Sequence, residues 1–251
     1  AMLPTLPKPL LLAHRGASAY APENTLAAFQ LAMQQGAHGV ELDAKLSADG
    51  EMIVMHDASV DRTTDGSGKV NELPLAALRE LRAGGRFSDR FPNEKIPTLV
   101  EVLETLGSRA IINIELTNYS TPRDGLPELA AELVEKMDLH ATVLFSSFLP
   151  ANLKRVRSRL PQARVAILAL PGLVGWPGRG WFGRRAAPEI VHPHHSDITP
   201  GFVRQEHARG RRVHTWTVND PRAARAFLLM GIDGLISDDP PAMLQVMEEL
   251  E

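Results

Sequence analysis

Short apolar runs alternate along the chain with segments in which apolar residues recur at helical spacing. The strand-like runs lie at residues 10–14, 38–46, 51–56, 110–116, 142–146, 164–168, 189–192, 212–218 and 234–237. Helical patterns lie at residues 24–35, 126–137, 149–160 and 220–230. Asn24 is expected to cap the first of these helices and Gly36 to end it. Such alternation is typical of βαβ units, so we predict an α/β fold, a TIM-like (β/α)8 barrel with outer helices.

Two neighbouring runs, residues 38–46 and 51–56, cannot both be parallel strands of that barrel. Only residues 47–50 separate them, and a parallel crossover needs about a dozen residues or more. The pair Asp49-Gly50 in this link is a strong hairpin signal. One of the strand-like runs must therefore be antiparallel, extra or not a strand, and we expect the second run to pair antiparallel with the first.

Residues 57–97 interrupt the alternation. They contain a loop rich in Thr, Asp, Gly and Ser, a helical pattern near residues 75–82, and the Gly-Gly and Phe-Pro pairs at residues 84–85 and 91–92. We predict an insertion at the barrel mouth, after the third strand, and not a separate domain. Residues 1–251 are then expected to form one domain.

Composition and charge narrow the possible functions. The chain has 251 residues, of which 44% are hydrophobic and 23% charged, as in an ordinary globular protein. The formal net charge of -3 includes no long block of one sign, which argues against a nucleic-acid partner. Cysteine is absent, which excludes disulfides, thiolate nucleophiles and cysteine-ligated zinc; a reducing cytosol is compatible with this, and we expect a cytoplasmic protein. We expect neither a secretory signal in residues 1–9 nor a membrane-spanning segment later.

Three carboxylates are predicted to face the barrel interior. Side chains alternate along a strand, so Glu41, Asp43 and Lys45 share one face. A solvated edge would explain Glu41 and Asp43 alone, but Glu115 lies in the otherwise apolar run at residues 111–116, where an unpaired carboxylate is costly. Three inward carboxylates require a cation, and ligation by oxygen alone favours Mg²⁺, Ca²⁺ or Mn²⁺.

Two histidines are candidates for acid/base catalysis beside such a cation. His14 ends a predicted strand and is followed by Arg15 and Gly16, a placement that suits phosphate contact over a tight turn. His56 ends another predicted strand. A lone histidine at a strand end more often bonds to a neighbouring carbonyl group, but two of them next to a metal site make an acid/base pair at neutral pH plausible.

An ordered set of motifs gives the chain a family resemblance. Residues 14–57 read HRGASAYAPENTLAAFQLAMQQGAHGVELDAKLSADGEMIVMHD. Further motifs are Asn-Ile-Glu-Leu at residues 113–116, Phe-Ser-Ser-Phe at 145–148, Trp-Thr-Val-Asn at 216–219, Gly-Ile-Asp-Gly at 231–234 and Ser-Asp at 237–238. Together they resemble the glycerophosphodiester phosphodiesterases, distant relatives of the phosphatidylinositol-specific phospholipases C. The resemblance covers nearly the whole chain.

The resemblance implies a metal-dependent enzyme that hydrolyses glycerophosphodiesters to sn-glycerol 3-phosphate and an alcohol. The residues that match the family's metal ligands, acid/base pair and phosphate contact are Glu41, Asp43 and Glu115, then His14 and His56, and Arg15. By similarity to the phospholipases C, His14 is expected to take a proton from the glycerol 2-hydroxyl and His56 to protonate the leaving alcohol. Water then opens a cyclic phosphate.

The chain departs from the family pattern at Thr117, where a lysine is common. Lys45, on the same predicted face as the carboxylates, is a candidate substrate-binding residue that supplies the missing charge, and a different preference for the leaving group is the alternative. Trp216 matches a tryptophan that packs near the substrate glycerol, although a place in the barrel core explains it equally well. Phe148 is expected to pack nearby.

Aromatic and basic side chains mix in the loop at residues 171–188. They are Trp176, Arg179, Trp181, Phe182, Arg184 and Arg185. Such a mixture can contact a lipid surface. A loop with a short helix over the barrel mouth is the simpler interpretation, and we prefer it to membrane contact.

A second cluster of possible metal ligands follows this loop. It consists of His192, His194, His195 and Asp197. We prefer a strand end followed by a polar loop, because Pro193 interrupts regular ligand geometry. His214 shows no comparable pattern.

Two other functions compete with hydrolysis of soluble glycerophosphodiesters. An enzyme on the same scaffold could act on lysophospholipids and release lysophosphatidic or cyclic phosphatidic acid, which an apolar groove near residues 176–182 would favour. A non-catalytic barrel that binds a phosphate ligand is the other alternative, and the complete set of two histidines and three carboxylates argues against it.

Overall fold

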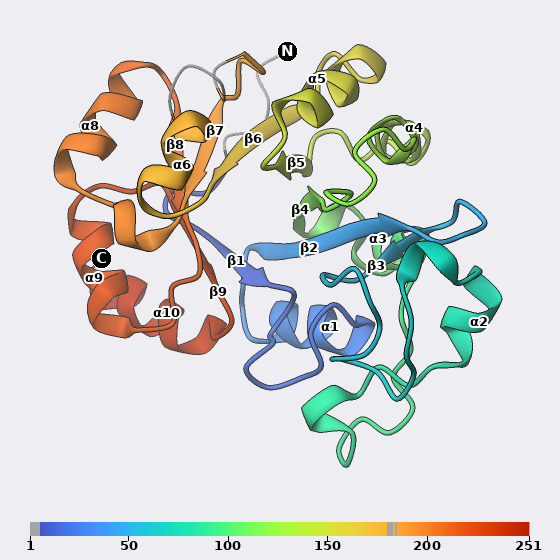
Figure 1. Cartoon of the computed structure of the whole chain (residues 1–251). Coiled ribbons are helices and arrows are strands. Elements are labelled where there is room, and N and C mark those ends of the chain that lie inside the picture. Colours follow the sequence, from blue (N-terminus) through green and yellow to red (C-terminus); the bar gives the residue numbers. More distant parts are fainter. Residues whose placement is uncertain (1–5, 180–182, 184, 251) are drawn as a thin grey trace.

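The computed structural model describes residues 6–179, 183 and 185–250, and its strands form a closed barrel (Figure 1). In chain order the strands are β1 (Leu10–His14), β2 (Gly39–Leu46), β3 (Met52–Val54), β4 (Ile111–Leu116), β5 (Val143–Ser147), β6 (Arg164–Ala169), β7 (Ile190–Pro193), β8 (Arg212–Thr215) and β9 (Gly234–Ser237). The ring runs β1-β9-β8-β7-β6-β5-β4-β2, closes through a β1–β2 pairing, and is parallel throughout. The predicted TIM-like (β/α)8 barrel is confirmed.

Strand β3 lies outside the ring and pairs antiparallel with β2, with Val54 opposite Ala44. The predicted antiparallel pair is confirmed, and it explains why there are more strands than places in the barrel. β3 ends two residues before His56, so the prediction of a strand over residues 51–56 was too long and His56 lies in the following loop. The prediction for residues 212–218 was also too long, because Trp216 keeps only an isolated bridge beyond the end of β8.

Helices connect the strands and lie around the outside of the barrel (Figure 1). They are α1 (Leu26–Gln34), α2 (Leu75–Glu80), α3 (Leu99–Leu106), α4 (Leu126–Lys136), α5 (Pro150–Arg159), α6 (Gly172–Arg179), α8 (Pro200–Ala208), α9 (Pro221–Leu229) and α10 (Pro240–Glu248). The sequence interpretation did not identify α3, α8 or α10, although Thr98 and Glu101 form a capping box at the start of α3. No helix in the described ranges has the length and apolar character needed to cross a bilayer.

Two apolar clusters cover the two faces of the barrel strands, which leaves the strand ends for polar side chains. The larger cluster packs helices against the outer face of the barrel, and the smaller one includes Leu10, Leu12, Leu144 and Ala166. Leu10, Leu12 and His14 share one face of β1, because side chains alternate along a strand. His14 is therefore the last residue of an apolar row, at the carboxyl end of the strand, where barrel enzymes place their chemistry.

Residues 57–97 run between β3 and α3 and include α2 and two short 3₁₀ helices, η1 (Val70–Glu72) and η2 (Gly85–Phe87). They share a small apolar core with β3, which consists of Ile53, Met55, Val60, Val70, Leu78, Ala83 and Ile96. Arg79 joins this segment to α3 through two hydrogen bonds of 2.8 Å to Glu101. The segment is thus attached to the barrel by its own packing and by an ion pair.

Candidate active site

Three carboxylates meet at the carboxyl ends of β2 and β4. The register of the two strands places Asp43 directly opposite Glu115. Glu41 lies two residues before Asp43, on the same face of β2. One oxygen of each carboxylate lies within 4.8 Å of the others. Within the described ranges, these residues form the only group of three or more possible metal ligands that meets this distance. The barrel therefore brings together the three carboxylates that the sequence singled out.

The electrostatics of this cluster fit a divalent cation. Burial raises the pKa of Glu115 to about 8, and the neighbouring charge of Asp43 adds to the shift. Burial, together with the charges of Asp43 and Glu115, also raises the pKa of Glu41 well above its usual range. Carboxylates this close cannot all ionise cheaply unless positive charge offsets their repulsion. A set of oxygen donors alone suits Mg²⁺, Ca²⁺ or Mn²⁺.

His14 is oriented between an acidic anchor and the carboxylate cluster. Its Nδ1 lies 2.7 Å from Oδ1 of Asp238, and its Nε2 lies 4.0 Å from Oε2 of Glu41. Asp238 also accepts hydrogen bonds of 2.8 Å from Ser18 and 2.6 Å from Asn219. With Nδ1 as the donor to Asp238, Nε2 is free to accept a proton on the side of the cluster.

Asp238 was quoted from the sequence only as part of a motif, and the structure gives it a contact with His14. Burial favours its neutral acid, but the hydrogen bonds from His14 and Asn219 outweigh burial and lower the pKa of Asp238 to about 2. An ionised carboxylate 2.7 Å from Nδ1 fixes the orientation of the imidazole ring and favours the tautomer that donates from Nδ1. The signal in the sequence was the Ser237-Asp238 pair at the end of the last predicted strand.

Arg15 contacts the cluster through its backbone and its side chain. Its backbone N–H donates to Glu41 at 3.1 Å, and its Nε lies 3.3 Å from Oδ2 of Asp43. The turn that allows this has positive φ angles of 55° at Arg15 and 83° at Gly16. A Cβ on Gly16 would lie 2.7 Å from the backbone of Ala28, so the turn requires glycine there.

Asn24 is not the helix cap that the sequence predicted. Thr25 caps α1, and the side chain of Thr25 accepts a hydrogen bond from Ala28 N–H. Asn24 has a φ of 57°, and its side-chain amide donates to Oδ2 of Asp43 at 2.8 Å. The capping pattern was present but one residue later, because Asn24 instead holds a candidate metal ligand.

His56 lies at the outer edge of the site. Its Nδ1 lies 2.7 Å from Oδ1 of Asp57, and Asp57 accepts further hydrogen bonds from Arg62. Hydrogen bonds from Arg62 and then from His56 lower the pKa of Asp57 despite its partial burial. Arg62 also donates to Glu23, which accepts from Arg15 at 2.8 Å. A chain of ion pairs thus joins the loop of His56 to that of Arg15, and sequence reasoning missed Glu23 and Arg62.

Lys45 and Thr117 contact each other beside the cluster. The Lys45 ammonium donates to the backbone oxygen of Thr117 at 2.9 Å and to its hydroxyl at 2.7 Å. Lys45 is only 9% exposed, and burial lowers the pKa of its ammonium. Thr117, where the resemblance implied a lysine, is therefore in direct contact with a lysine from the neighbouring strand.

Aromatic rings line the mouth after β4, β5 and β8, and we call Tyr119, Phe148 and Trp216 the aromatic wall. The Phe148 ring centroid lies 5.6 Å from that of Tyr119 and 5.8 Å from that of Trp216, in both cases edge to face. Tyr119 donates to Glu115 at 2.8 Å, and the Trp216 indole donates to the backbone oxygen of His192 at 2.8 Å. Trp216 packs against the apolar cluster inside the barrel, which agrees with the core interpretation, and its place near the substrate glycerol stays a prediction.

The histidines after the 171–188 loop do not gather around one point. His192 points into the barrel, where its ring centroid lies 5.3 Å from that of His214, and both side chains are fully buried. Burial lowers the pKa of His214 to about 3 and that of His192 well below its usual range. His194 instead contacts the Trp216 ring at 5.3 Å. The sequence gave no hint of the His192–His214 pair.

The short helix expected in the 171–188 loop is present as α6. Leu173 and Val174 on it are strongly exposed. Trp181, Phe182 and Arg184, and the side chains of Trp176 and Arg179, lie outside the described residues.

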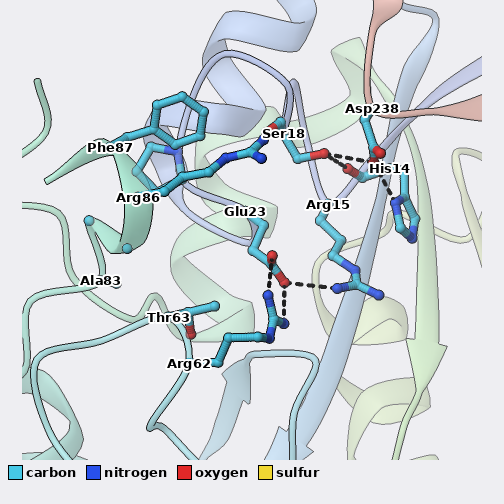
Figure 2. A pocket seen from close by; sticks show the side chains of 13 residues that line it. His14, Arg15, Ser18, Glu23, Arg62, Thr63, Ala83, Arg86, Phe87 and Asp238 are labelled. Carbon is cyan, nitrogen blue, oxygen red and sulfur yellow. Dashed lines mark hydrogen bonds and ion pairs between the residues drawn. The ribbon is translucent and has the colours of Figure 1, made fainter. Parts of the chain in front are cut away.

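A cavity of about 330 Å³ opens beside His14 (Figure 2). One wall comes from the loop between β1 and α1, and the other from residues 57–97. The lining residues are His14, Arg15, Ser18, Pro22, Glu23, Arg62, Thr63, Ala83, Gly84, Gly85, Arg86, Phe87 and Asp238. A molecule in this cavity would touch His14 and Arg15 directly.

Comparison with known proteins agrees with the geometry. The model of the glycerophosphoryl diester phosphodiesterase family matches residues 14–242. A glycerophosphodiester phosphodiesterase of Caldanaerobacter subterraneus is 35% identical over 96% of this chain and 99% of its own length. Human glycerophosphodiester phosphodiesterase 1 is 37% identical over 83% of this chain and 71% of its own. The structure of an Oleispira antarctica phosphodiesterase in complex with the product sn-glycerol 3-phosphate is 33% identical, with a TM-score of 0.84, and covers 96% of this chain and 97% of that one.

Proposed function

The chain belongs to the glycerophosphoryl diester phosphodiesterase family and is a glycerophosphodiester phosphodiesterase, and we propose that it releases sn-glycerol 3-phosphate with the help of a divalent cation. The observation that carries this proposal is the placement of His14, whose ring bridges Asp238 and the three-carboxylate cluster. Membership of an enzyme family removes the non-catalytic binding barrel from consideration. A cytoplasmic location remains a prediction from the lack of cysteine.

Glu41, Asp43 and Glu115 would hold the cation, Mg²⁺ or Ca²⁺, with Mn²⁺ as a further candidate. When bound, it supplies positive charge that offsets the negative charge developing on the phosphate oxygens. Arg15 adds a guanidinium on the same side, 3.3 Å from Asp43, where it can contact a phosphate oxygen. The Lys45 ammonium at Thr117 contributes further charge near the phosphate.

His14 acts as the first base in this proposal. Its Nε2 takes the proton of the glycerol 2-hydroxyl, and Asp238 stabilises the resulting imidazolium through Nδ1. The 2-oxygen forms a bond to phosphorus while the bond to the leaving alcohol breaks, and His56 gives its proton to the departing oxygen. Water then attacks the cyclic phosphate and loses a proton to His56, while His14 returns its proton to the 2-oxygen.

The test is release of glycerol 3-phosphate from glycerophosphocholine, followed with a coupled dehydrogenase. Wild type is assayed with Mg²⁺, with Ca²⁺ and with chelator, beside His14→Ala and a control, His140→Ala. His140 is a suitable control because it precedes β5, at the amino end of the barrel strands, and its ion pair is with Asp138, at 3.2 Å. We expect release that needs a cation, survives in His140→Ala and is lost in His14→Ala. Equal activity with chelator and with cation would contradict the metal proposal.

The role of His56 has its own test. A good leaving group such as nitrophenol departs without a proton, so His56→Ala should lose much less activity on a nitrophenyl diester than on glycerophosphocholine. Equal losses on the two substrates would contradict the assignment of His56 as the acid.

Lysophospholipids are a second candidate substrate class. Leu173 is 91% exposed and Val174 74% exposed on α6. At the start of α6, the backbone N–H of Gly172 donates to Asp197. Asp197 lies three residues after His194, whose ring contacts Trp216 of the aromatic wall. Release of choline from lysophosphatidylcholine at a rate similar to that from glycerophosphocholine would favour this class, and Leu173→Ser should then lower only the rate on the lipid.

A further inference from the structure

The cavity beside His14 has its own chemistry, distinct from that of the aromatic wall. We propose that this cavity binds the leaving alcohol of the diester, and that Arg86 makes it prefer alcohols with hydroxyl or anionic oxygens over alcohols with a quaternary ammonium group. The inference rests on the proposed function, because it assigns the second half of the same substrate to a site.

Position supports the cavity as the site of the leaving alcohol. Around the barrel ring, β2 and its carboxylates lie between β1 and its loop on one side and β4 and β5, which precede Tyr119 and Phe148, on the other. The carboxylate cluster and His14 lie between the aromatic wall and the cavity. A diester whose phosphate sits at the cluster therefore places one alcohol against the wall and the other in the cavity.

The contacts of His56 indicate which of the two alcohols of the diester lies in the cavity. Glu23, Thr63 and Ala83 line both the cavity and a small recess that also contains His56. Arg62 lines the cavity and donates to Asp57, the partner of His56. Because His56 is the proposed acid for the departing oxygen, the alcohol that receives this proton lies on the cavity side.

The carboxylates of the cavity are already paired. Glu23 accepts from both Arg15 and Arg62, and Asp238 accepts from His14 and Ser18 (Figure 2). Asp238 also accepts from Asn219. A cationic alcohol would have to compete with these partners. The lining thus offers no uncommitted negative charge among its described residues.

Arg86 is the opposite case. Its guanidinium donates to the backbone oxygen of Ser18 at 2.9 Å and lies 4.8 Å from the centre of the Phe87 ring. It forms no ion pair with a carboxylate in the described part of the chain, and a guanidinium has five N–H donors. The remaining donors suit hydroxyl, carboxylate or phosphate oxygens, and they repel an ammonium group.

The loop that carries Arg86 is held by tight backbone packing. A Cβ on Gly84 would lie 2.8 Å from the Cα of Ser88, and Gly85 has a φ of +50°. Ala83 N–H donates to the backbone oxygen of Glu94 at 2.7 Å. The turn that carries Arg86 is therefore constrained, and this fixes the position of the guanidinium at the edge of the cavity.

The experiment compares three glycerophosphodiesters by kcat/KM for release of glycerol 3-phosphate. They are glycerophosphoglycerol, glycerophosphocholine and the 3,3-dimethylbutyl ester, a neutral isostere of the choline ester. The enzymes are wild type, Arg86→Gln, Arg86→Lys and a matched control, Arg90→Gln. Arg90 lies four residues later, stacks 5.6 Å from the Phe91 ring in the same way, and does not line the cavity.

We expect wild type to prefer glycerophosphoglycerol to glycerophosphocholine by about tenfold, with the dimethylbutyl ester in between, since one exposed charge contact is worth a modest factor. Arg86→Gln should reduce this ratio to within about threefold, whereas Arg86→Lys and Arg90→Gln should keep most of it. A thermal melt of each variant establishes that it is folded.

Two results would overturn the inference while leaving the proposed function intact: a ratio unchanged in Arg86→Gln, or equal losses on all three esters. A wild type that prefers the choline ester would also overturn it. Failure to release glycerol 3-phosphate from any ester with any cation would instead reject the proposed function, and the inference with it.

Discussion

Ring contacts between Tyr119, Phe148 and Trp216 form one side of the barrel mouth, whereas ion pairs among Glu23, Arg62 and their neighbours form the other. The aromatic side rises directly from the ends of barrel strands. The charged side depends on a loop and on the 57–97 segment, which packs on its own small core. A constant part of a substrate suits the first kind of wall, and a variable part suits the second, because loops change more readily than strands.

His14 belongs to both sides, since it lines the cavity and also faces the cluster next to Tyr119. The largest expected effect is therefore at its anchor. Asp238→Asn should lower kcat by about 10² to 10³ on every ester, because His14 loses the carboxylate that orients it and stabilises its positive form. The pH profile of kcat should change as well, which a purely structural defect would not cause.

Asp239→Asn is the matched control for this change. Asp239 caps α10 and accepts a hydrogen bond from Tyr20, without contacting His14. Because Asn caps a helix about as well as Asp, Asp239→Asn should leave stability close to that of wild type and kcat within about threefold of it. A loss of less than about threefold in Asp238→Asn would show that His14 needs no carboxylate anchor.

Lowering the pH should weaken the histidine packing beneath the aromatic wall before it breaks the ion pairs of the charged side. Trp216 bonds to the backbone of His192, which packs on His214 inside the barrel. The unfolded chain protonates these histidines below about pH 6.5. The folded chain resists protonation, down to a pKa of about 3 for His214. The free energy of unfolding should therefore fall as the pH drops below about 6.5, by roughly 1.4 kcal/mol per pH unit for each imidazole.

Hydrogen bonds from Arg62 and Arg15 outweigh burial and lower the pKa of Glu23 to about 2, so its ion pairs persist across this window and are lost only near that pH. Urea unfolding at pH 7 and pH 5 separates the contributions. His192→Gln should lose less stability between these pH values than wild type, while His140→Gln, at a half-buried histidine, should lose as much. Equal losses in all three proteins would contradict the role of the buried pair.

The charged side should discriminate between leaving groups. Arg62→Ala removes the bridge between Glu23 and Asp57 and leaves His56 less well held, so kcat/KM on glycerophosphocholine should fall by about tenfold. The loss should be smaller on a nitrophenyl diester, whose departure needs no proton. Arg82→Ala, which breaks an exposed pair with Asp65 in the same segment, serves as the control.

The aromatic side should not discriminate between leaving groups. Phe148→Ala should lower kcat/KM by about five- to tenfold on both esters, mainly through KM, because glycerol is common to them and loses an apolar contact. If Phe148→Ala instead separates the two esters and Arg62→Ala does not, the two sides have been assigned the wrong way round.

Lys45 should show the smallest effect. Lys45→Met removes the ammonium bound to Thr117, and KM should rise by about threefold if this charge helps to hold the phosphate. Lys69→Met, at an exposed lysine paired with Glu72, is the control. Unchanged activity and KM in Lys45→Met would refute the idea that Lys45 replaces the lysine missing at position 117.

Sequence periodicity was sufficient for most of the barrel, because the direction of side chains along a strand is a local property. It placed β1 and β9 at their observed limits and recognised the hairpin from Asp49 and Gly50. It was less successful where neighbouring strands decide the outcome. β3 is shorter than predicted because its pairing with β2 ends at Val54. Asn24 does not cap the helix because its side chain donates to Asp43.

The sequence by itself determined the barrel and the chemical character of the site, since His14, Glu41, Asp43 and Glu115 each occur at strand positions whose facing follows from alternation. Only the tertiary structure decided which loops meet. Asp238 lies 224 residues from His14, and Ser18 lies 68 residues from Arg86. Such contacts depend on closure of the barrel ring and on packing of the 57–97 segment, and no local pattern encodes them.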